Sequence, residues 1–176
     1  MAVERWIALA GYMGAGKSTV GRLAAGQLGV QFLDADDLVM AHAGQDIPEI
    51  FAQRGELWFR RTEEDLIREN LQADPGVLAL GGGALGSRRT RDLLARTAWV
   101  AWIRIDPELA WDRVGGKPGR PLALDRDRFI RRAAEREAVY REAADVILDG
   151  SQPPDEVARV LAEWATGGGP DEERAG

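Results

Sequence analysis

Residues 11–19 read "GYMGAGKST" and directly follow the short apolar run "WIALA" at residues 6–10. A glycine, four further residues and then Gly-Lys-Ser is the spacing of a phosphate-binding loop, and it stands here between a strand-like run and a helix-like segment, as that loop requires. Glycines let backbone N–H groups curl around phosphates, and the helix that follows points its positive end at them. The stretch therefore predicts a nucleoside triphosphate site at the end of the first strand.

The side chains of this loop have separate expected tasks. The Lys17 ammonium can reach the β- and γ-phosphates, and the Ser18 hydroxyl can bind Mg²⁺. The expected nucleotide-binding residues are Gly14, Ala15, Gly16, Lys17, Ser18 and Thr19. The loop alone does not distinguish a kinase from an ATPase, a GTPase or a non-catalytic nucleotide-binding protein.

The rest of the chain predicts the fold class. Apolar runs of strand length recur at residues 30–34, 77–80, 99–105 and 145–149, and longer segments with helical spacing lie between them. Strands that are apolar on both faces and alternate with helices are typical of a parallel sheet covered on both sides. The sequence therefore predicts an α/β protein with about five strands.

Composition limits the possible partners and surroundings. The 176 residues fit one domain, and the net charge of −6 excludes broad attraction to nucleic acid or to an anionic membrane. There is no cysteine, which fits a reducing compartment, and no apolar run approaches the length of a membrane span. We expect a cytoplasmic protein with no nucleic-acid partner and no membrane partner.

Acidic residues follow the second predicted strand in the stretch "FLDADD" at residues 32–37. Ligands of an open α/β sheet bind outside the carboxyl ends of its strands. If the chain stays extended, Asp34 and Asp36 share one side, so one can hold Mg²⁺ through water while the other orients or deprotonates an attacking hydroxyl. Asp37 is interpreted as the N-cap of the next helix.

Two further stretches contribute candidate site residues. In "RGELWFRRTEED" at residues 54–65, Arg60 and Glu63 are three apart on a predicted helix and can pair. The run "VLALGGGAL" at residues 77–85 ends a predicted strand in three glycines, which form either a flexible linker or a wall that a ligand approaches closely.

Six stretches together resemble the shikimate kinase family. They are "GYMGAGKSTVGRLAA", "FLDADDLV", "IFAQRGELWFRRTEE", "VLALGGGA", "GRPL" and "REAVYREAAD", in that family's order and spacing from about residue 6 to about residue 150. The resemblance implies a three-layer P-loop fold of the nucleoside monophosphate kinase type, with a five-stranded parallel sheet of order 2-3-1-4-5, helices on both faces and a mobile lid. It implies one kinase domain over residues 1–166, with the substrate-binding region at about 35–70 and the lid at about 113–125. The glycine, proline and charged residues of "GGGPDEERAG" at residues 167–176 predict a disordered tail.

The resemblance also assigns roles to residues. Asp36 corresponds to the base, Asp34 to the magnesium aspartate, and Lys17 and Arg120 to the cations that act on the phosphates. Arg113 corresponds to the residue stacked on adenine. The residues that correspond to the acceptor site are Asp36, Arg60, Gly81, Gly82, Gly83 and Arg136.

The activity implied by the resemblance is transfer of the γ-phosphoryl group of ATP, with Mg²⁺, to the 3-hydroxyl of shikimate, in the route to chorismate and the aromatic amino acids. The family also implies a monomer. One alternative is another small-molecule kinase of the same fold, such as a gluconate kinase, and another is a nucleotide-binding module without catalysis. The glycine triplet and "FRRTEE" favour shikimate over gluconate, and retention of all six charged candidates favours an enzyme.

Overall fold

A five-stranded parallel sheet forms the centre of the molecule. The computed structural model describes residues 3–114 and 125–170. Its strands are β1 (Trp6–Ala10), β2 (Phe32–Asp34), β3 (Val77–Ala79), β4 (Ala98–Arg104) and β5 (Val146–Asp149). They lie in the order β2-β3-β1-β4-β5, and each pair is parallel. The predicted fold class and strand order are therefore confirmed.

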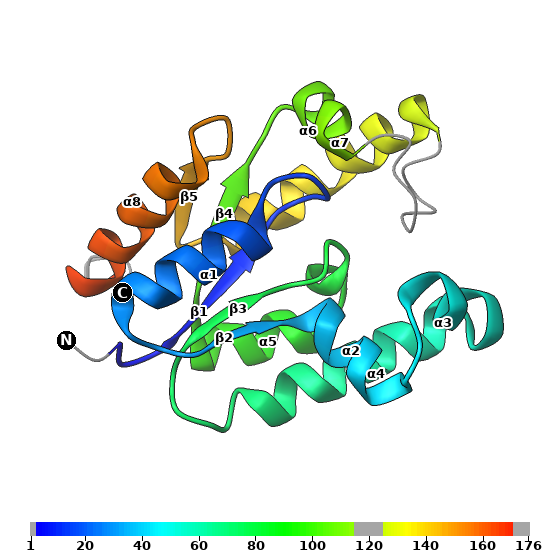
Figure 1. The fold of residues 1–176 in the computed structure, drawn as a ribbon, viewed down its shortest axis with the longest axis horizontal. Coiled ribbons are helices and arrows are strands. Elements are labelled where there is room, and N and C mark those ends of the chain that lie inside the picture. Colours follow the sequence, from blue (N-terminus) through cyan, green and yellow to red (C-terminus); the bar gives the residue numbers. More distant parts are fainter. Residues whose placement is uncertain (1–2, 115–124, 171–176) are drawn as a thin grey trace.

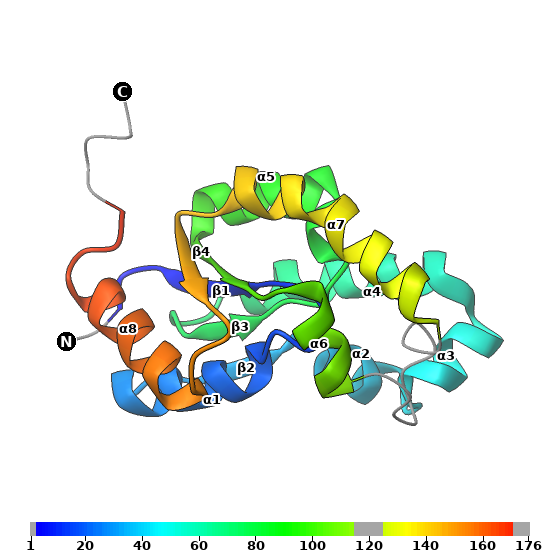
Figure 2. The same ribbon diagram turned by 90° about the horizontal axis from the view of Figure 1, so that it is seen from above.

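Helices cover both faces of this sheet, so the fold has three layers (Figures 1 and 2). In chain order the helices are α1 (Lys17–Leu28), α2 (Ala35–Ala43), α3 (Ile47–Gln53), α4 (Gly55–Asn70), α5 (Arg88–Thr97), α6 (Pro107–Val114), α7 (Arg126–Ala143) and α8 (Pro154–Thr166), with a short 3₁₀ helix at Ala84–Gly86. Helices α1 and α8 pack side by side on one face, whereas α5 and α7 lie on the other.

The central strand β1 contributes to both hydrophobic cores. Its five residues are all buried, because neighbouring strands flank it and helices cover both of its faces. Trp6 and Ala8 belong to the core on the α5 and α7 side, while Ile7 and Leu9 belong to the core under α1 and α8. This two-sided burial explains why the run "WIALA" is apolar throughout rather than alternating.

Helices α2 and α3 and the first turns of α4 form a lobe beyond the carboxyl end of β2 (Figure 1), while Ile67 near the end of α4 packs in the main core. Val39, Ile50 and Phe59 make a small core of their own there. A capping box starts α3, because Asp46 accepts from the Glu49 N–H while the Glu49 side chain accepts from the Asp46 N–H. This lobe coincides with the region predicted to bind the acceptor.

Both predicted boundary segments lie partly beyond the described residues. Arg113 and Val114 still belong to α6, Asp125 caps α7, and the intervening lid residues 115–124, including Arg120, lie outside the described part. Gly167 and Gly169 donate backbone hydrogen bonds to the end of α8, so hydrogen-bonded structure continues past the predicted boundary at 166, and residues 171–176 are not described.

Across the described ranges 3–114 and 125–170, none of the helices combines the length and the apolar character that crossing a bilayer demands.

Candidate active site

The phosphate-binding loop connects β1 to α1, and its glycines adopt conformations that other residues avoid. Gly11, Gly14 and Gly16 have φ values of 147°, 87° and 93°. A Cβ atom at Gly14 would lie 2.6 Å from the backbone oxygen of Ala110 in α6. Both the backbone angle and the close approach of α6 therefore require glycine at this position.

Lys17 lies across the mouth of the loop, and its Nζ donates to the carbonyl oxygens of Gly11 at 2.8 Å and Tyr12 at 3.3 Å. Helix α1 begins at this lysine without a side-chain cap and without an acidic residue in its first turn. A helix start of this kind directs its first N–H groups and its positive end at a bound anion. The Ala15 N–H donates to the Tyr12 carbonyl, and this hydrogen bond stabilises the conformation of the loop itself.

Asp34 links the loop to the second strand. The Ser18 hydroxyl donates to Asp34 Oδ2 at 2.5 Å, and the Asp36 N–H donates to Asp34 Oδ1 at 3.0 Å. Asp34 is thus the N-cap of α2, and the interpretation of Asp37 as that cap is wrong; Asp37 instead pairs with Arg22 at 3.6 Å on the surface. The condition under which Asp34 and Asp36 share one side is not met, because α2 begins at Ala35 and the chain is no longer extended there.

The oxygens around Ser18 suit a hard cation. A serine hydroxyl beside one carboxylate offers the oxygen ligands that Mg²⁺ prefers, and Mg²⁺ commonly completes its shell with water and substrate phosphate. Within the described residues no cluster of three or more His, Cys, Asp or Glu could hold a metal by itself. The residues present therefore fit a magnesium ion that arrives with a nucleotide.

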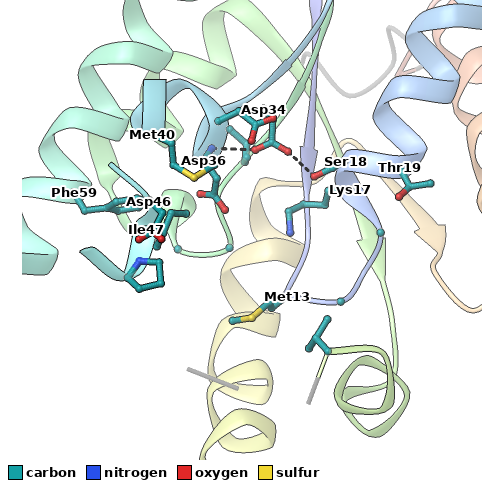
Figure 3. Close-up of a pocket in the computed structure, with 18 of the residues that line it drawn as sticks. Met13, Lys17, Ser18, Thr19, Asp34, Asp36, Met40, Asp46, Ile47 and Phe59 are labelled. Carbon is teal, nitrogen blue, oxygen red and sulfur yellow. Dashed lines mark hydrogen bonds between the residues drawn. The ribbon is translucent and has the colours of Figure 1, made fainter. Parts of the chain in front are cut away.

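One cavity of about 680 Å³ joins the loop to the α2–α4 lobe. Figure 3 shows Lys17 and Asp36 entering this cavity from opposite sides, with Ser18 and Asp34 above them in this view. The predicted site residues that line it are Gly14, Gly16, Lys17, Ser18, Thr19, Asp34, Asp36, Arg60, Gly82, Gly83, Arg113 and Arg136. The sequence did not single out most of the apolar part of the wall, which includes Met13, Met40, Ile47 and Pro48.

Arg60 is held on the acceptor side by Glu63, as predicted. Its NH1 donates to Glu63 Oε2 at 2.8 Å, and its Nε lies 3.7 Å from Glu56. The Glu63 side chain is only 2% exposed, and burial raises the pKa of its carboxyl despite the neighbouring Arg60 charge. The Oε1 atom of Glu63 has no hydrogen-bond partner among the described residues. Glu63 therefore holds one arginine of the site in place. The spacing of Arg60 and Glu63 predicted this pairing, but it did not predict that Glu63 is buried.

The three glycines after β3 face three different neighbours. A Cβ at Gly81 would overlap Oε1 of Glu63 and lie 3.1 Å from Asp36 Oδ1, and one at Gly83 would lie 2.6 Å from Arg60 NH2. At Gly82 the nearest atom would be Arg136 NH1 at 3.5 Å, which is ordinary contact. Gly81 and Gly83 thus leave space for the Glu63 and Arg60 side chains, and Gly82 and Gly83 both line the cavity.

The Gly82 carbonyl accepts two hydrogen bonds from α7. Arg136 NH1 donates at 2.9 Å, and the Tyr140 hydroxyl donates at 2.6 Å. Burial raises the pKa of Tyr140 to about 12. The sequence analysis missed Tyr140, although its position four residues after Arg136 puts both on one helix face and was a usable signal.

Arg113 stands at the nucleotide end of the cavity, where its NH1 donates to the Gly14 carbonyl at 3.3 Å. It thereby ties the end of α6 to the phosphate-binding loop. Arg120 lies among the residues that the structure does not describe.

A phosphate-binding loop on this sheet order, facing arginines and a carboxylate across one cavity, defines a P-loop kinase of small anionic acceptors. The family model of shikimate kinase matches residues 13–166. A shikimate kinase of Symbiobacterium thermophilum is 40% identical over 162 residues, covering 88% of this chain and 93% of that protein. The chain belongs to the shikimate kinase family.

Solved structures agree with this assignment. The shikimate kinase of Acinetobacter baumannii in complex with shikimate superposes with a TM-score of 0.88 at 32% identity, covering 93% of this chain and 94% of that one. A gluconokinase from Sinorhizobium meliloti has a TM-score of 0.66 at 17% identity, with 96% and 95% covered, and at that identity it shares the fold alone.

Proposed function

We propose that this protein transfers the γ-phosphoryl group of ATP to the 3-hydroxyl of shikimate, giving shikimate 3-phosphate and ADP in the route to chorismate. The observation that carries the proposal is that Lys17, Asp36 and the arginines Arg60 and Arg136 line one cavity. A triphosphate site and a site for an anionic polyol thus open into the same space, as phosphoryl transfer requires.

Two guanidinium groups bind the acceptor carboxylate. Planar guanidinium forks match a carboxylate in geometry and charge better than ammonium groups do. Arg60 comes from α4 and Arg136 from α7, so the acid is held from two elements. This grip fixes the ring of the acceptor and thereby orients its hydroxyls relative to the phosphate-binding loop.

Asp36 accepts the hydrogen bond of the attacking hydroxyl and takes its proton. It follows the N-cap of α2, and Figure 3 shows its carboxylate directed into the cavity towards Lys17. A positioned carboxylate orients the attacking hydroxyl in line with the bond that breaks. By taking the proton, it prevents positive charge from building up on the hydroxyl oxygen. Catalysis here rests chiefly on positioning and on charge neutralisation.

The nucleotide occupies the loop end of the cavity. Lys17 and the uncapped start of α1 bind the phosphates, and Arg113 packs on the adenine. Ser18 and, through water, Asp34 would hold Mg²⁺, which would supply neutralisation of charge on the phosphate oxygens. The proposed lid cation, Arg120, belongs to the segment outside the described ranges.

The remaining parts of the proposal concern surroundings and assembly. We propose a cytoplasmic monomer, supported by family membership, by the absence of cysteine in the sequence and by its net charge of −6, which also disfavours nucleic acid and anionic membranes as partners.

The experiment that tests this function is ADP release, measured by a coupled assay with ATP and Mg²⁺. The acceptors are shikimate, gluconate and none. We expect release to depend on shikimate, with gluconate no better than the blank. Release with gluconate alone would instead favour the related sugar-acid kinase activity, and equal release without acceptor would indicate an ATPase.

A further inference from the structure

The second residue of the phosphate-binding loop, Tyr12, has its side chain under an arginine of the acceptor site. The Arg136 guanidinium carbon lies 5.2 Å from the centroid of the Tyr12 ring, within the range of a cation–π contact. The tyrosine is only 5% exposed, so the contact is largely shielded from water. Burial of this kind strengthens the attraction between the ring face and the cation.

The ring is fixed in place from the same helix that carries the arginine. Phe129 of α7 packs edge-on against Tyr12, with ring centroids 4.8 Å apart and planes at 66°. Phe129 is fully buried, and Arg136 lies seven residues further along the same helix face. Tyr12 is therefore a rigid platform between the loop and α7.

The two arginines of the acceptor site are held in different ways. Arg60 has two carboxylate neighbours, Glu56 and Glu63. None of the ion pairs in residues 3–114 and 125–170 includes Arg136: its NH1 donates to the Gly82 carbonyl, its guanidinium lies over the Tyr12 ring, and Tyr140 is a further neighbour. A carbonyl and an aromatic face orient a guanidinium without cancelling its charge, so Arg136 keeps its full charge for an anionic acceptor.

Tyr12 also belongs to the nucleotide site through its backbone. Its carbonyl accepts from Lys17 Nζ at 3.3 Å and from the Ala15 N–H at 3.1 Å. The position of the Tyr12 ring under Arg136 is therefore coupled to the backbone of the phosphate-binding loop. One residue connects the lysine that faces the nucleotide with the arginine that faces the acceptor.

We infer that Tyr12 is a positioning residue for the acceptor: its ring holds Arg136 in the geometry that binds the substrate carboxylate, and its backbone ties that geometry to the phosphate-binding loop. This inference rests on the proposed function, since shikimate is the acceptor used in its test. It assigns the hydroxyl of Tyr12 no part, because that oxygen is buried and has no hydrogen-bond partner among the described residues.

The test is a double-mutant cycle on acceptor affinity, using Tyr12→Leu, Arg136→Ala and both together. Loss of the ring should raise the KM for shikimate about ten-fold, within the range of a shielded cation–π contact, and change the KM for ATP less than two-fold. In the Arg136→Ala background the same change should have no further effect on the shikimate KM. Equal effects in both backgrounds, or an equal rise in both KM values, would overturn the inference.

Two further variants at position 12 distinguish the electrostatic effect of the aromatic ring from the effect of its size. Tyr12→Phe keeps the ring and should hold the shikimate KM within two-fold of the unaltered chain. Pentafluorophenylalanine in place of Tyr12 keeps the shape but reverses the charge distribution of the ring face, so it should raise the KM as Tyr12→Leu does. If the fluorinated chain behaves like Tyr12→Phe, the contact with the cation is irrelevant.

Trp111→Leu is the matched control. Trp111 packs on the same Phe129 ring at 5.4 Å, and no described arginine stacks on it. We expect the Trp111→Leu substitution to change the shikimate KM less than two-fold. A ten-fold rise would mean that the Tyr12 effect comes from weaker packing of this core and not from the contact with Arg136.

The failure of the proposed function and the failure of this inference give different results. If the unaltered chain does not use shikimate at all, the proposed function fails. If it does use shikimate and the double-mutant cycle is additive, only the role of Tyr12 fails.

Discussion

The Ser18 hydroxyl donates to Asp34 Oδ2 at 2.5 Å, and this bond joins the first turn of α1 to the end of β2. The other oxygen of Asp34 caps α2 and so sets where Asp36 enters the cavity. One carboxylate therefore fixes both the proposed magnesium ligand and the start of the helix that carries the proposed base.

Asp34→Asn tests the magnesium assignment. The amide oxygen of asparagine can still cap the helix, and its NH2 group can donate to the Ser18 hydroxyl oxygen, so we expect the melting temperature to change by only a few degrees. Loss of the negative charge should raise the Mg²⁺ concentration needed for half-maximal activity about ten-fold. An unchanged Mg²⁺ dependence, measured at saturating ATP, would remove Asp34 from the metal site.

Asp36→Asn tests the proposed base. The amide can still orient a hydroxyl but cannot take its proton, so kcat should fall by about 10²- to 10⁴-fold. Binding of ADP, followed by calorimetry, should stay within two-fold. Asp37→Asn is the control, because Asp37 is exposed and pairs with Arg22 on the surface, and its kcat should stay within two-fold. Similar losses in both variants would argue against a specific role for Asp36.

Glu63→Gln tests the buried carboxyl through pH. Burial raises the pKa of Glu63, so the folded protein retains a proton where the unfolded chain has released it. Between the two pKa values the folded state binds more protons, and the free energy of unfolding therefore falls as pH rises. We expect the variant to be more stable than the unaltered chain at pH 7.5, with the difference shrinking towards pH 5. Urea unfolding at several pH values measures this, and a difference independent of pH would contradict it.

Two glycine substitutions should have opposite signatures. At Gly82 a methyl group has ordinary contacts only, so Gly82→Ala should leave stability nearly unchanged. It should raise the shikimate KM about ten-fold, which corresponds to about 1.4 kcal/mol, while the ATP KM stays within two-fold.

At Gly81 the methyl group would overlap Glu63, so Gly81→Ala should lower the free energy of unfolding by about 1–3 kcal/mol. Thermal unfolding and steady-state kinetics check both, and a larger effect of Gly82→Ala on ATP than on shikimate would put the acceptor wall elsewhere.

The fold could be predicted from short stretches of sequence, because backbone angles and strand burial determine which residues occur within each stretch. The loop of residues 11–19 needs its glycines for backbone angles, and the two-sided burial of β1 makes that strand apolar at every position. The pairing of Arg60 with Glu63 was likewise predictable, since both lie on one turn of α4. In each case the residues that matter are close together in the sequence.

The parts that could not be predicted depend on contacts between distant segments. Which aspartate caps α2 depended on where β2 ends, and the answer was Asp34 rather than Asp37. Tyr12 gained its neighbour Arg136 only when α7 packed against the loop, 124 residues further along the chain by the numbering of the two residues. A pattern in one segment carries no information about such a partner.

The most direct measurement of the central claim is the identity of the phosphorylated product. The chain is incubated with ATP, Mg²⁺ and shikimate, and the products are followed by ³¹P and ¹H NMR. The account predicts a single phosphomonoester whose phosphorus couples to the proton on carbon 3 of shikimate, formed one-to-one with ADP. Inorganic phosphate as the only new phosphorus species, or an ester on another hydroxyl, would contradict it.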